Sequence, residues 1–361
     1  ILVSENSVGL NSGMILTAGD KSPGMKATWE SRAENTGWIL TLGEEAHGMF
    51  AWVSSDVVNS SLITTSGDRS FGMMAEANSS ATNTASGDIH TNGELAHGMA
   101  ASDDSLVTNQ GFIVTSGDNA YGMRAGNFSA ATNSGTITTF GNFGRGIRVV
   151  DHSTGQNTAS GSIETWGSGS SGMVADIHSV ISNEGSIVTH GNSAYGMHAL
   201  GGSTALNTAM DSIETWGESA YGMAAFDNST ALNTGSITTH GDKAIGMYAH
   251  ISSYATNSGF ITTYGAEAFG MRADEGSSLW NYGSILTEGD GAHGMDVVES
   301  SDAFNAGTIT TRGLDAHAVR VDNGGVFTNS GTLDSLNGYA VAATGHSQVT
   351  LNDGTVLAGS H

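Results

Sequence analysis

Acidic side chains recur at one position of this sequence, and they are the first candidates for chemistry. Each follows a Thr-x-Gly triplet directly: Asp20, Glu44, Asp68, Glu94, Asp118, Glu218, Asp242 and Asp290. A glycosidase needs two carboxylates that converge on one groove, and a calcium site needs several oxygen ligands. Because these acids are distributed one per segment, the pattern favours a solvated turn. We predict no catalytic residue and no cofactor, with weak Ca²⁺ binding between neighbouring acids as the alternative.

Histidines offer a second possible chemistry. Four of the 13 share one position of the pattern, His47, His97, His293 and His317, and only the last two belong to consecutive segments. A zinc site needs three or four converging ligands, so no metal site is predicted. Asp151 and His152 are neighbours, but one Asp-His pair is weak evidence for catalysis. No long insertion interrupts the pattern to build a pocket, which disfavours an enzyme.

An aromatic column suits binding better. Six successive segments place a ring directly after a threonine: Phe140, Trp166, His190, Trp216, His240 and Tyr264. A row of outward rings is typical of a surface that contacts sugar or another protein. We take these six residues as the candidate binding surface, with packing of one copy of the chain against another as the alternative. A second ring position, occupied by Phe71, Tyr121, Tyr195, Tyr221 and Phe269, is expected to cover an adjacent glycine.

The few positive charges gather in another column. Lys26, Arg124, Arg148, Arg272 and Arg320 each follow a position that is usually methionine. The chain has 11 Lys and Arg against 35 Asp and Glu. We therefore expect these cations to pair with nearby acids of the same chain, with the acidic column of another copy as the alternative.

All these columns arise from one internal repeat, which can be anchored on an asparagine. It recurs with a spacing of 24 residues, or 26 where two residues are inserted after Asn83, Asn157 and Asn207. The column comprises Asn11, Asn35, Asn59, Asn83, Asn109, Asn133, Asn157, Asn183, Asn207, Asn233, Asn257, Asn281, Asn305 and Asn329, with a weaker member at Asn352. A fixed period of this length indicates a solenoid.

Three short strands fit each repeat. The motif I-x-T-x-G alternates with the period of a strand, as does G-M-x-A, and a looser segment precedes each asparagine. Eleven of the 14 methionines occupy one column: Met25, Met49, Met73, Met99, Met123, Met173, Met197, Met223, Met247, Met271 and Met295. Identical inward residues can close a core only if successive repeats stack about 4.8 Å apart.

The sequence therefore predicts an all-β fold, a right-handed parallel β-helix of about 14 rungs of 24–26 residues with three short strands per rung. Right-handedness follows because crossovers between parallel strands almost always have that hand. Stacked asparagine amides would donate to one neighbour and accept from the other. Glycines at the repeated turns are expected to adopt positive φ.

The composition limits the classes of partner that the chain is expected to bind. A net charge of -24 disfavours nucleic acid and anionic membrane surfaces, and no run of about 18 apolar residues could span a bilayer. Zero cysteine excludes a disulfide framework. The N-terminal ILVSENSVGL does not read as a signal peptide.

The motif N-[ST]-G-x-I-x-T-x-G-x-x-A-x-G-M-x-A, over about residues 9 to 358, resembles the passenger repeats of Gram-negative autotransporters of the adhesin type, which use type V secretion. The resemblance implies a β-helical stalk exported to the cell surface, with adhesion, self-association or biofilm-type contacts as its role. Residues 1–361 would be a single repeat domain, a mature or trimmed passenger without its own caps.

We expect a non-enzymatic extracellular structural or adhesive module. Its partner would be a host surface protein, a carbohydrate or identical chains. Pectate lyases and phage tailspikes are also right-handed β-helices, so a carbohydrate-active enzyme is one alternative. A filament subunit whose copies stack end to end is the other.

Overall fold

The computed structural model describes residues 1–208, 212–352 and 354–358. It has two compact units, residues 1–186 and 187–361, which are treated separately below. The described residues form 45 short strands, three per coil, and include no helix long and apolar enough to cross a membrane. The predicted right-handed parallel β-helix is confirmed, with 15 coils rather than about 14. The single-domain organisation stays a prediction.

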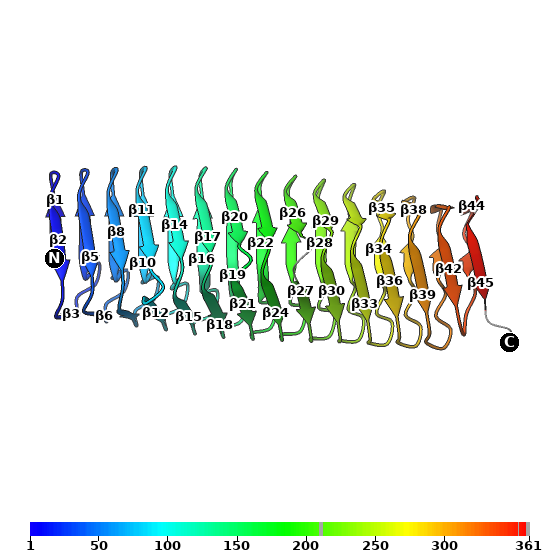
Figure 1. The fold of residues 1–361 in the computed structure, drawn as a ribbon, viewed down its shortest axis with the longest axis horizontal. Helices are drawn as coiled ribbons and strands as arrows, with labels where there is room; N and C mark the ends of the chain where they lie inside the picture. Colours follow the sequence, from blue (N-terminus) through cyan, green and yellow to red (C-terminus); the bar gives the residue numbers. More distant parts are fainter. Residues whose placement is uncertain (209–211, 353, 359–361) are drawn as a thin grey trace. The chain divides into compact units, whose positions relative to one another are not determined.

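Each unit contains three parallel sheets, which we name after the column that each buries: the methionine, asparagine and isoleucine sheets. Strands of successive coils lie side by side within each unit (Figure 1). In unit 1 the methionine sheet contains β1 (Leu2–Ser4), β4 (Met25–Thr28), β7 (Met49–Trp52), β10 (Met73–Glu76), β13 (Met99–Ser102), β16 (Tyr121–Gly126), β19 (Arg145–Val150) and β22 (Ser171–Asp176). Its asparagine sheet contains β2 (Val8–Asn11), β5 (Arg32–Asn35), β8 (Asp56–Asn59), β11 (Ser80–Asn83), β14 (Leu106–Asn109), β17 (Ala130–Asn133), β20 (Thr154–Asn157) and β23 (Val180–Asn183). Its isoleucine sheet contains β3 (Met14–Thr17), β6 (Trp38–Thr41), β9 (Leu62–Thr65), β12 (Asp88–Thr91), β15 (Phe112–Thr115), β18 (Thr136–Thr139) and β21 (Ser162–Thr165).

Unit 2 repeats this arrangement, and β24 (Ser186–Thr189) begins at the last residue of unit 1. Its methionine sheet contains β25 (Met197–Ala199), β28 (Met223–Phe226), β31 (Met247–His250), β34 (Met271–Ala273), β37 (Met295–Val297), β40 (Val319–Val321) and β43 (Val341–Ala343). Its asparagine sheet contains β26 (Thr204–Asn207), β29 (Thr230–Asn233), β32 (Tyr254–Asn257), β35 (Ser278–Asn281), β38 (Asp302–Asn305), β41 (Val326–Asn329) and β44 (Gln348–Leu351). Its isoleucine sheet contains β27 (Ser212–Thr215), β30 (Ser236–Thr239), β33 (Phe260–Thr263), β36 (Ser284–Thr287), β39 (Thr308–Thr311), β42 (Thr332–Ser335) and β45 (Thr355–Ala358).

Like residues lie over like residues in both units, as the repeat predicts. In unit 1 the strand register places Met49 beside Met73 and Ile39 beside Ile63. In unit 2 it places Met223 beside Met247. These side chains are fully or almost fully buried, because alternation along each strand points every second residue into the core.

The asparagine ladder is confirmed. In each unit, Nδ2 of one asparagine donates to Oδ1 of the next at 2.7–2.8 Å. A serine ladder that the sequence analysis missed runs beside it, in which a serine hydroxyl accepts the backbone N–H of the preceding coil's serine at 3.1–3.2 Å. Both ladders satisfy buried polar groups that would otherwise destabilise the turns.

The prediction that Asn352 belongs to the asparagine column is wrong. The register pairs Asn329 with Leu351, so Asn352 lies one residue beyond the column. The interval from Asn329 to Leu351 is shorter than 24 residues, and β44 and β45 have exposed residues throughout.

The predicted reason for the repeated glycines is also wrong. The positive φ angles fall mainly on residues other than glycine. Examples are Glu45, Arg69 and Leu95, which occupy the equivalent turn position in three successive coils. Gly67 is required for a different reason, since a Cβ there would lie 1.9 Å from the carbonyl oxygen of Gly43 in the preceding coil. Close stacking of backbone, rather than dihedral freedom, selects glycine at this position.

Candidate binding surfaces

The predicted aromatic column forms a ring stack in unit 2. Trp216 directly follows β27, His240 follows β30 and Tyr264 follows β33. The ring centroids of Trp216 and His240 are 3.8 Å apart with planes 6° apart, and those of His240 and Tyr264 are 5.2 Å apart with planes 12° apart. Trp216 and Tyr264 are each 49% exposed. We call these three residues the ring ladder.

Stacking within the ring ladder covers both faces of the middle ring and one face of each outer ring. Both faces of the His240 ring are covered by its neighbours, and its Nε2 lies 2.9 Å from Oε1 of Glu214. Sugars stack on ring faces, whereas protein interfaces also use ring edges and rims. The ring ladder therefore has both ring edges and ring faces with which to contact a partner.

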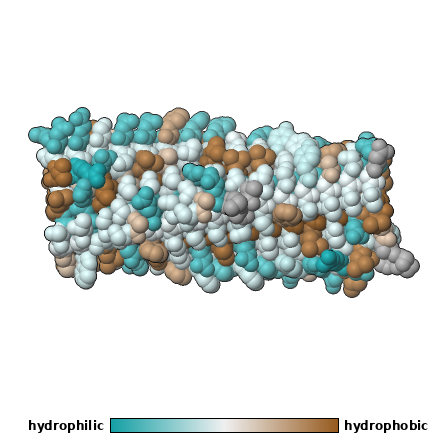
Figure 2. Space-filling view, in the orientation of Figure 1, coloured by the Kyte–Doolittle hydropathy of each residue, from teal (hydrophilic) through white to brown (hydrophobic). Residues whose placement is uncertain are grey.

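The other residues of the column are placed as follows. In unit 1, the rings of Phe140 and Trp166 lie 6.5 Å apart at 19°, and each is about half exposed. His190, after β24, is half-buried. One surface composed of all six residues stays a prediction. Figure 2 shows apolar residues of the face it presents scattered in small areas among polar ones.

The second ring column is structural. His47, Phe71, His97 and Tyr121 stack in unit 1 with centroids 4.4–4.9 Å apart. Nδ1 of His97 accepts the backbone N–H of Tyr121 at 3.0 Å, and burial lowers the pKa of His97 to about 3. In unit 2, Nδ1 of His293 accepts the N–H of His317 in the same way. These neutral imidazoles link coils.

The acidic column also links coils. Oδ1 of Asp20 accepts the backbone N–H of Glu44 at 2.9 Å, and Asp68, Asp118, Asp242 and Asp290 make the equivalent bond at 2.8–2.9 Å. Among the described residues no group of three His, Asp or Glu is placed to hold a metal ion. Asp151 and His152 form a surface pair, with Nδ1 of the histidine 3.0 Å from the carboxylate.

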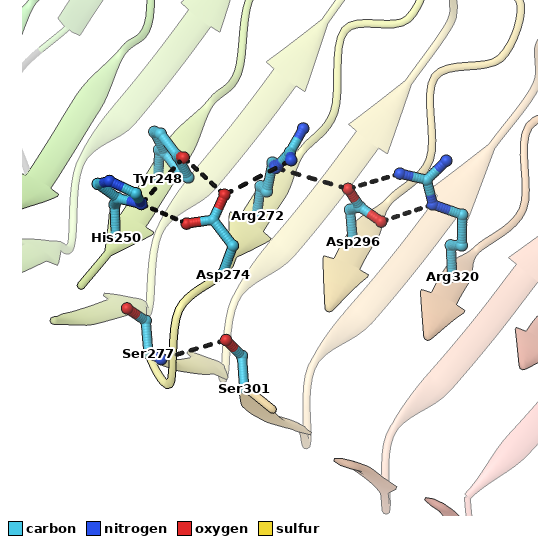
Figure 3. A network of polar contacts seen from close by, with 8 residues as sticks. All are labelled: Tyr248, His250, Arg272, Asp274, Ser277, Asp296, Ser301 and Arg320. Carbon is cyan, nitrogen blue, oxygen red and sulfur yellow. Dashed lines mark hydrogen bonds and ion pairs between the residues drawn. The ribbon is translucent and has the colours of Figure 1, made fainter. Parts of the chain in front are cut away.

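A polar network on the outer face of the unit 2 methionine sheet was not predicted (Figure 3). Oδ2 of Asp274 accepts the Tyr248 hydroxyl at 2.7 Å, and Oδ1 lies 2.6 Å from Nδ1 of His250. Asp274 is almost fully buried. Burial, followed by the hydrogen bond to Asp274, raises the pKa of Tyr248, so its hydroxyl remains a donor.

The network continues as alternating charges. Arg272 lies between Asp274 and Asp296, at 3.5 and 3.7 Å. Arg320 holds the fully buried Asp296 through two hydrogen bonds of 2.6 and 2.8 Å (Figure 3). Below it, the N–H of Ser277 donates to the Ser301 hydroxyl at 3.1 Å. The signal was present in the sequence, because Arg272, Asp296 and Arg320 follow the methionine column in three consecutive repeats.

The prediction that the cations after the methionine column pair with acids holds for three of them. Arg272 and Arg320 contact Asp296, and Arg148 lies 3.6 Å from Asp176. Lys26 instead lies 4.7 Å from the centre of the Phe50 ring. It lines an open groove of about 520 Å³ in unit 1, together with Phe71.

The family model of the BigA third pectate lyase-like domain matches residues 1–120, 113–210 and 201–300. The chain belongs to this family. Successive matches along one BigA-type chain are expected of a solenoid, in which each group of coils resembles the next. No curated protein sequence matches the chain.

A solved structure shares the BigA-type fold. The cryo-EM structure of the Vag8-C1 inhibitor complex matches with a TM-score of 0.67 and 16% sequence identity, covering 98% of this chain and 97% of that chain. An identity this low shows the fold alone. With the family match, it confirms the resemblance to an autotransporter passenger domain.

Proposed function

We propose that this chain is a non-enzymatic binding module, displayed outside the cell as an autotransporter passenger, and that its ring ladder contacts a host surface protein. The ring ladder carries the proposal: Trp216 and Tyr264 are each 49% exposed, yet both are fixed by stacking on His240. Rings that are already ordered lose little conformational entropy on binding.

Two further observations support this choice of partner. Vag8, whose structure shares this fold, was solved in a complex with C1 inhibitor. The acidic charge of -24 also suits a partner with a basic surface.

The test compares a Trp216→Ser/Tyr264→Ser double variant with the unaltered chain. Labelled protein is titrated on host cells before and after the cells are treated with protease or with glycosidases. We expect protease to abolish binding, glycosidases to leave it, and the double variant to bind at least about tenfold more weakly, as expected for hot-spot residues.

The matched control is Phe112→Ser, which removes an exposed ring from β15 in unit 1. It should bind like the unaltered chain, and all variants should share one circular dichroism spectrum. Unchanged binding by the double variant would remove the ring ladder from the proposal. Sedimentation of the purified chain tests self-association, and a concentration-dependent dimer lost in the double variant would favour identical chains as the partner.

A carbohydrate-active enzyme is the second candidate, and one observation favours it. Asp274 contacts both Tyr248 and His250, which are residue types that transfer protons in enzymes. Incubation with acidic and neutral polysaccharides, followed by assay for new reducing or unsaturated ends, tests this candidate. Product formation that His250→Gln abolishes would replace the binding proposal with an enzymatic one.

A further inference from the structure

Three arginines cluster on the outer face of the unit 1 methionine sheet. The register of β16 and β19 places Arg148 beside Arg124 and Arg145 beside Tyr121. The Tyr121 hydroxyl accepts hydrogen bonds from Nη1 of Arg145 at 3.0 Å and from Nη1 of Arg148 at 3.4 Å. We call Arg124, Arg145 and Arg148 the arginine cluster.

The positive charge of the arginine cluster is poorly compensated within the chain. Among the described residues, Asp176 has the one carboxylate within ion-pair distance of any of the three, 3.6 Å from Nη2 of Arg148. Nε of Arg145 and Nε of Arg148 are buried without a hydrogen-bond partner. Burial and the neighbouring Arg148 lower the pKa of Arg124, as expected for a cation beside a like charge.

The groups beneath the cluster are neutral. Tyr121 is 6% exposed and stacks on His97, whose Nδ1 already accepts a backbone N–H. The equivalent column of unit 2 is different, because there Asp296 contacts both Arg272 and Arg320. In unit 1 the residue that follows Arg148 in this column is Val174. The buried carboxylate of Asp296 therefore has no counterpart at this position of unit 1, where Arg148 pairs with Asp176 instead.

We infer that the arginine cluster binds a carboxylate of a partner protein, an Asp or Glu side chain on its docking surface. Guanidinium groups bind carboxylates through paired, charge-assisted hydrogen bonds. Among the described residues the one ion pair of the arginine cluster is that of Arg148, so Arg124 has no carboxylate partner. This inference rests on the proposed protein-binding function and adds a second contact, in unit 1, with its own chemistry.

Two observations favour a protein over an acidic polymer. Phe143 is 56% exposed and its carbonyl oxygen accepts a hydrogen bond from Nη1 of Arg145 at 3.3 Å, so an exposed aromatic residue adjoins the cluster. Arginine beside an aromatic ring is the composition of interface hot spots. A nucleic acid or heavily sulfated glycan would be repelled by the net charge of -24, whereas a protein can offer one carboxylate within a basic surface.

The experiment titrates the full chain with two peptides whose ends are blocked. In the first peptide two glutamates are flanked by leucine and lysine, and in the second both glutamates are replaced by glutamine. Calorimetry should detect binding of the glutamate peptide alone. Arg124→Gln should weaken it at least about tenfold, the loss expected for one hydrogen bond between charged groups. Because Arg124 has no carboxylate partner, this variant should melt at the same or a higher temperature than the unaltered chain.

Arg32→Gln is the matched control, since Arg32 is an exposed arginine of unit 1 that pairs with Glu34. It should bind the peptide like the unaltered chain. The inference is overturned if the glutamate peptide does not bind, if Arg124→Gln binds it equally well, or if a glucuronate disaccharide binds through Arg124 while the peptide does not. Loss of host-cell binding in the ring-ladder variant is measured separately, so either proposal can fail while the other stands.

Discussion

Nδ1 of His97 accepts the backbone N–H of Tyr121 at 3.0 Å, and the two rings stack with their centroids 4.4 Å apart. An imidazole that accepts at Nδ1 and is buried against an aromatic ring must stay neutral. Burial lowers the pKa of His97 to about 3 and that of His47 to about 4.

Acid should therefore destabilise the fold before carboxylates titrate. The unfolded chain binds a proton at His97 and at His47 near pH 6.5, whereas the folded chain does so only near pH 3 and pH 4, respectively. The contribution of these residues is complete above pH 6.5 and is lost as pH falls toward 4. Denaturant midpoints measured between pH 7 and 4 should fall steadily. His97→Phe, which copies Phe71 in the same column, should show a shallower fall, and equal slopes would contradict the assignment.

Replacing Gly67 by alanine should destabilise unit 1 strongly. The added Cβ would lie 1.9 Å from the carbonyl oxygen of Gly43, so the backbone of two coils must separate. Overpacking of this kind costs about 1–3 kcal/mol or more. Gly13→Ala is the control, since nothing lies within 4 Å of its added Cβ. Urea unfolding of both variants measures the difference, and equal midpoints would refute close backbone stacking as the reason for glycine.

Asn109→Leu should lower the free energy of unfolding by about 1–3 kcal/mol, the usual effect of leaving buried polar groups unpaired. Asn109 accepts from Asn83 and donates to Asn133, each at 2.8 Å, and its Oδ1 also accepts the Gly111 N–H at 3.3 Å, so the substitution removes these three hydrogen bonds. Gln110→Leu adds the same side chain at an exposed neighbour and should change stability by less than about 0.5 kcal/mol. Chemical denaturation of the pair gives the comparison; a similar loss in both would mean that the ladder contributes little.

Arg320→Met should destabilise unit 2 by about 3–5 kcal/mol, because Asp296 is fully buried and loses its two-bond partner. The control, Arg312→Met, breaks an exposed pair with Glu288 at 2.9 Å. That exposed ion pair should contribute at most about 1 kcal/mol to the free energy of unfolding. Thermal unfolding of the two variants should separate them clearly, and an unaltered melting temperature for Arg320→Met would show that Arg272 alone compensates Asp296.

Several features could be predicted because they depend on one repeat at a time. The columns of Met49, Ile63 and Asn59 each recur at a fixed spacing, so their burial and stacking follow from the period alone. The acidic column was also assigned correctly to a turn, although its hydrogen bonds to the next coil, such as Asp20 to Glu44, were not foreseen.

Other features depend on contacts between different residue types in neighbouring coils. Comparing one position of the repeat at a time does not reveal these contacts. In the sequence, Asp296 is one variable residue that follows a methionine. Only the structure shows that its carboxylate contacts both Arg272 and Arg320. Similarly, Trp216 and Tyr264 read as outward rings, but only the structure shows that each stacks one face on His240.

The sequence alone determined the architecture: a period of 24–26 residues with three alternating segments can bury its Ile, Met and Asn columns only as a parallel β-helix. The tertiary structure decided which outward groups satisfy one another and which remain free to bind. The physical reason is the short distance between adjacent coils, because each side chain contacts mainly the residue at the same position of the neighbouring coil. Inward residues meet the same or a similar residue about 4.8 Å away in the adjacent coil, whereas each outward residue meets whatever that coil carries, and at Arg124 that neighbour is another arginine.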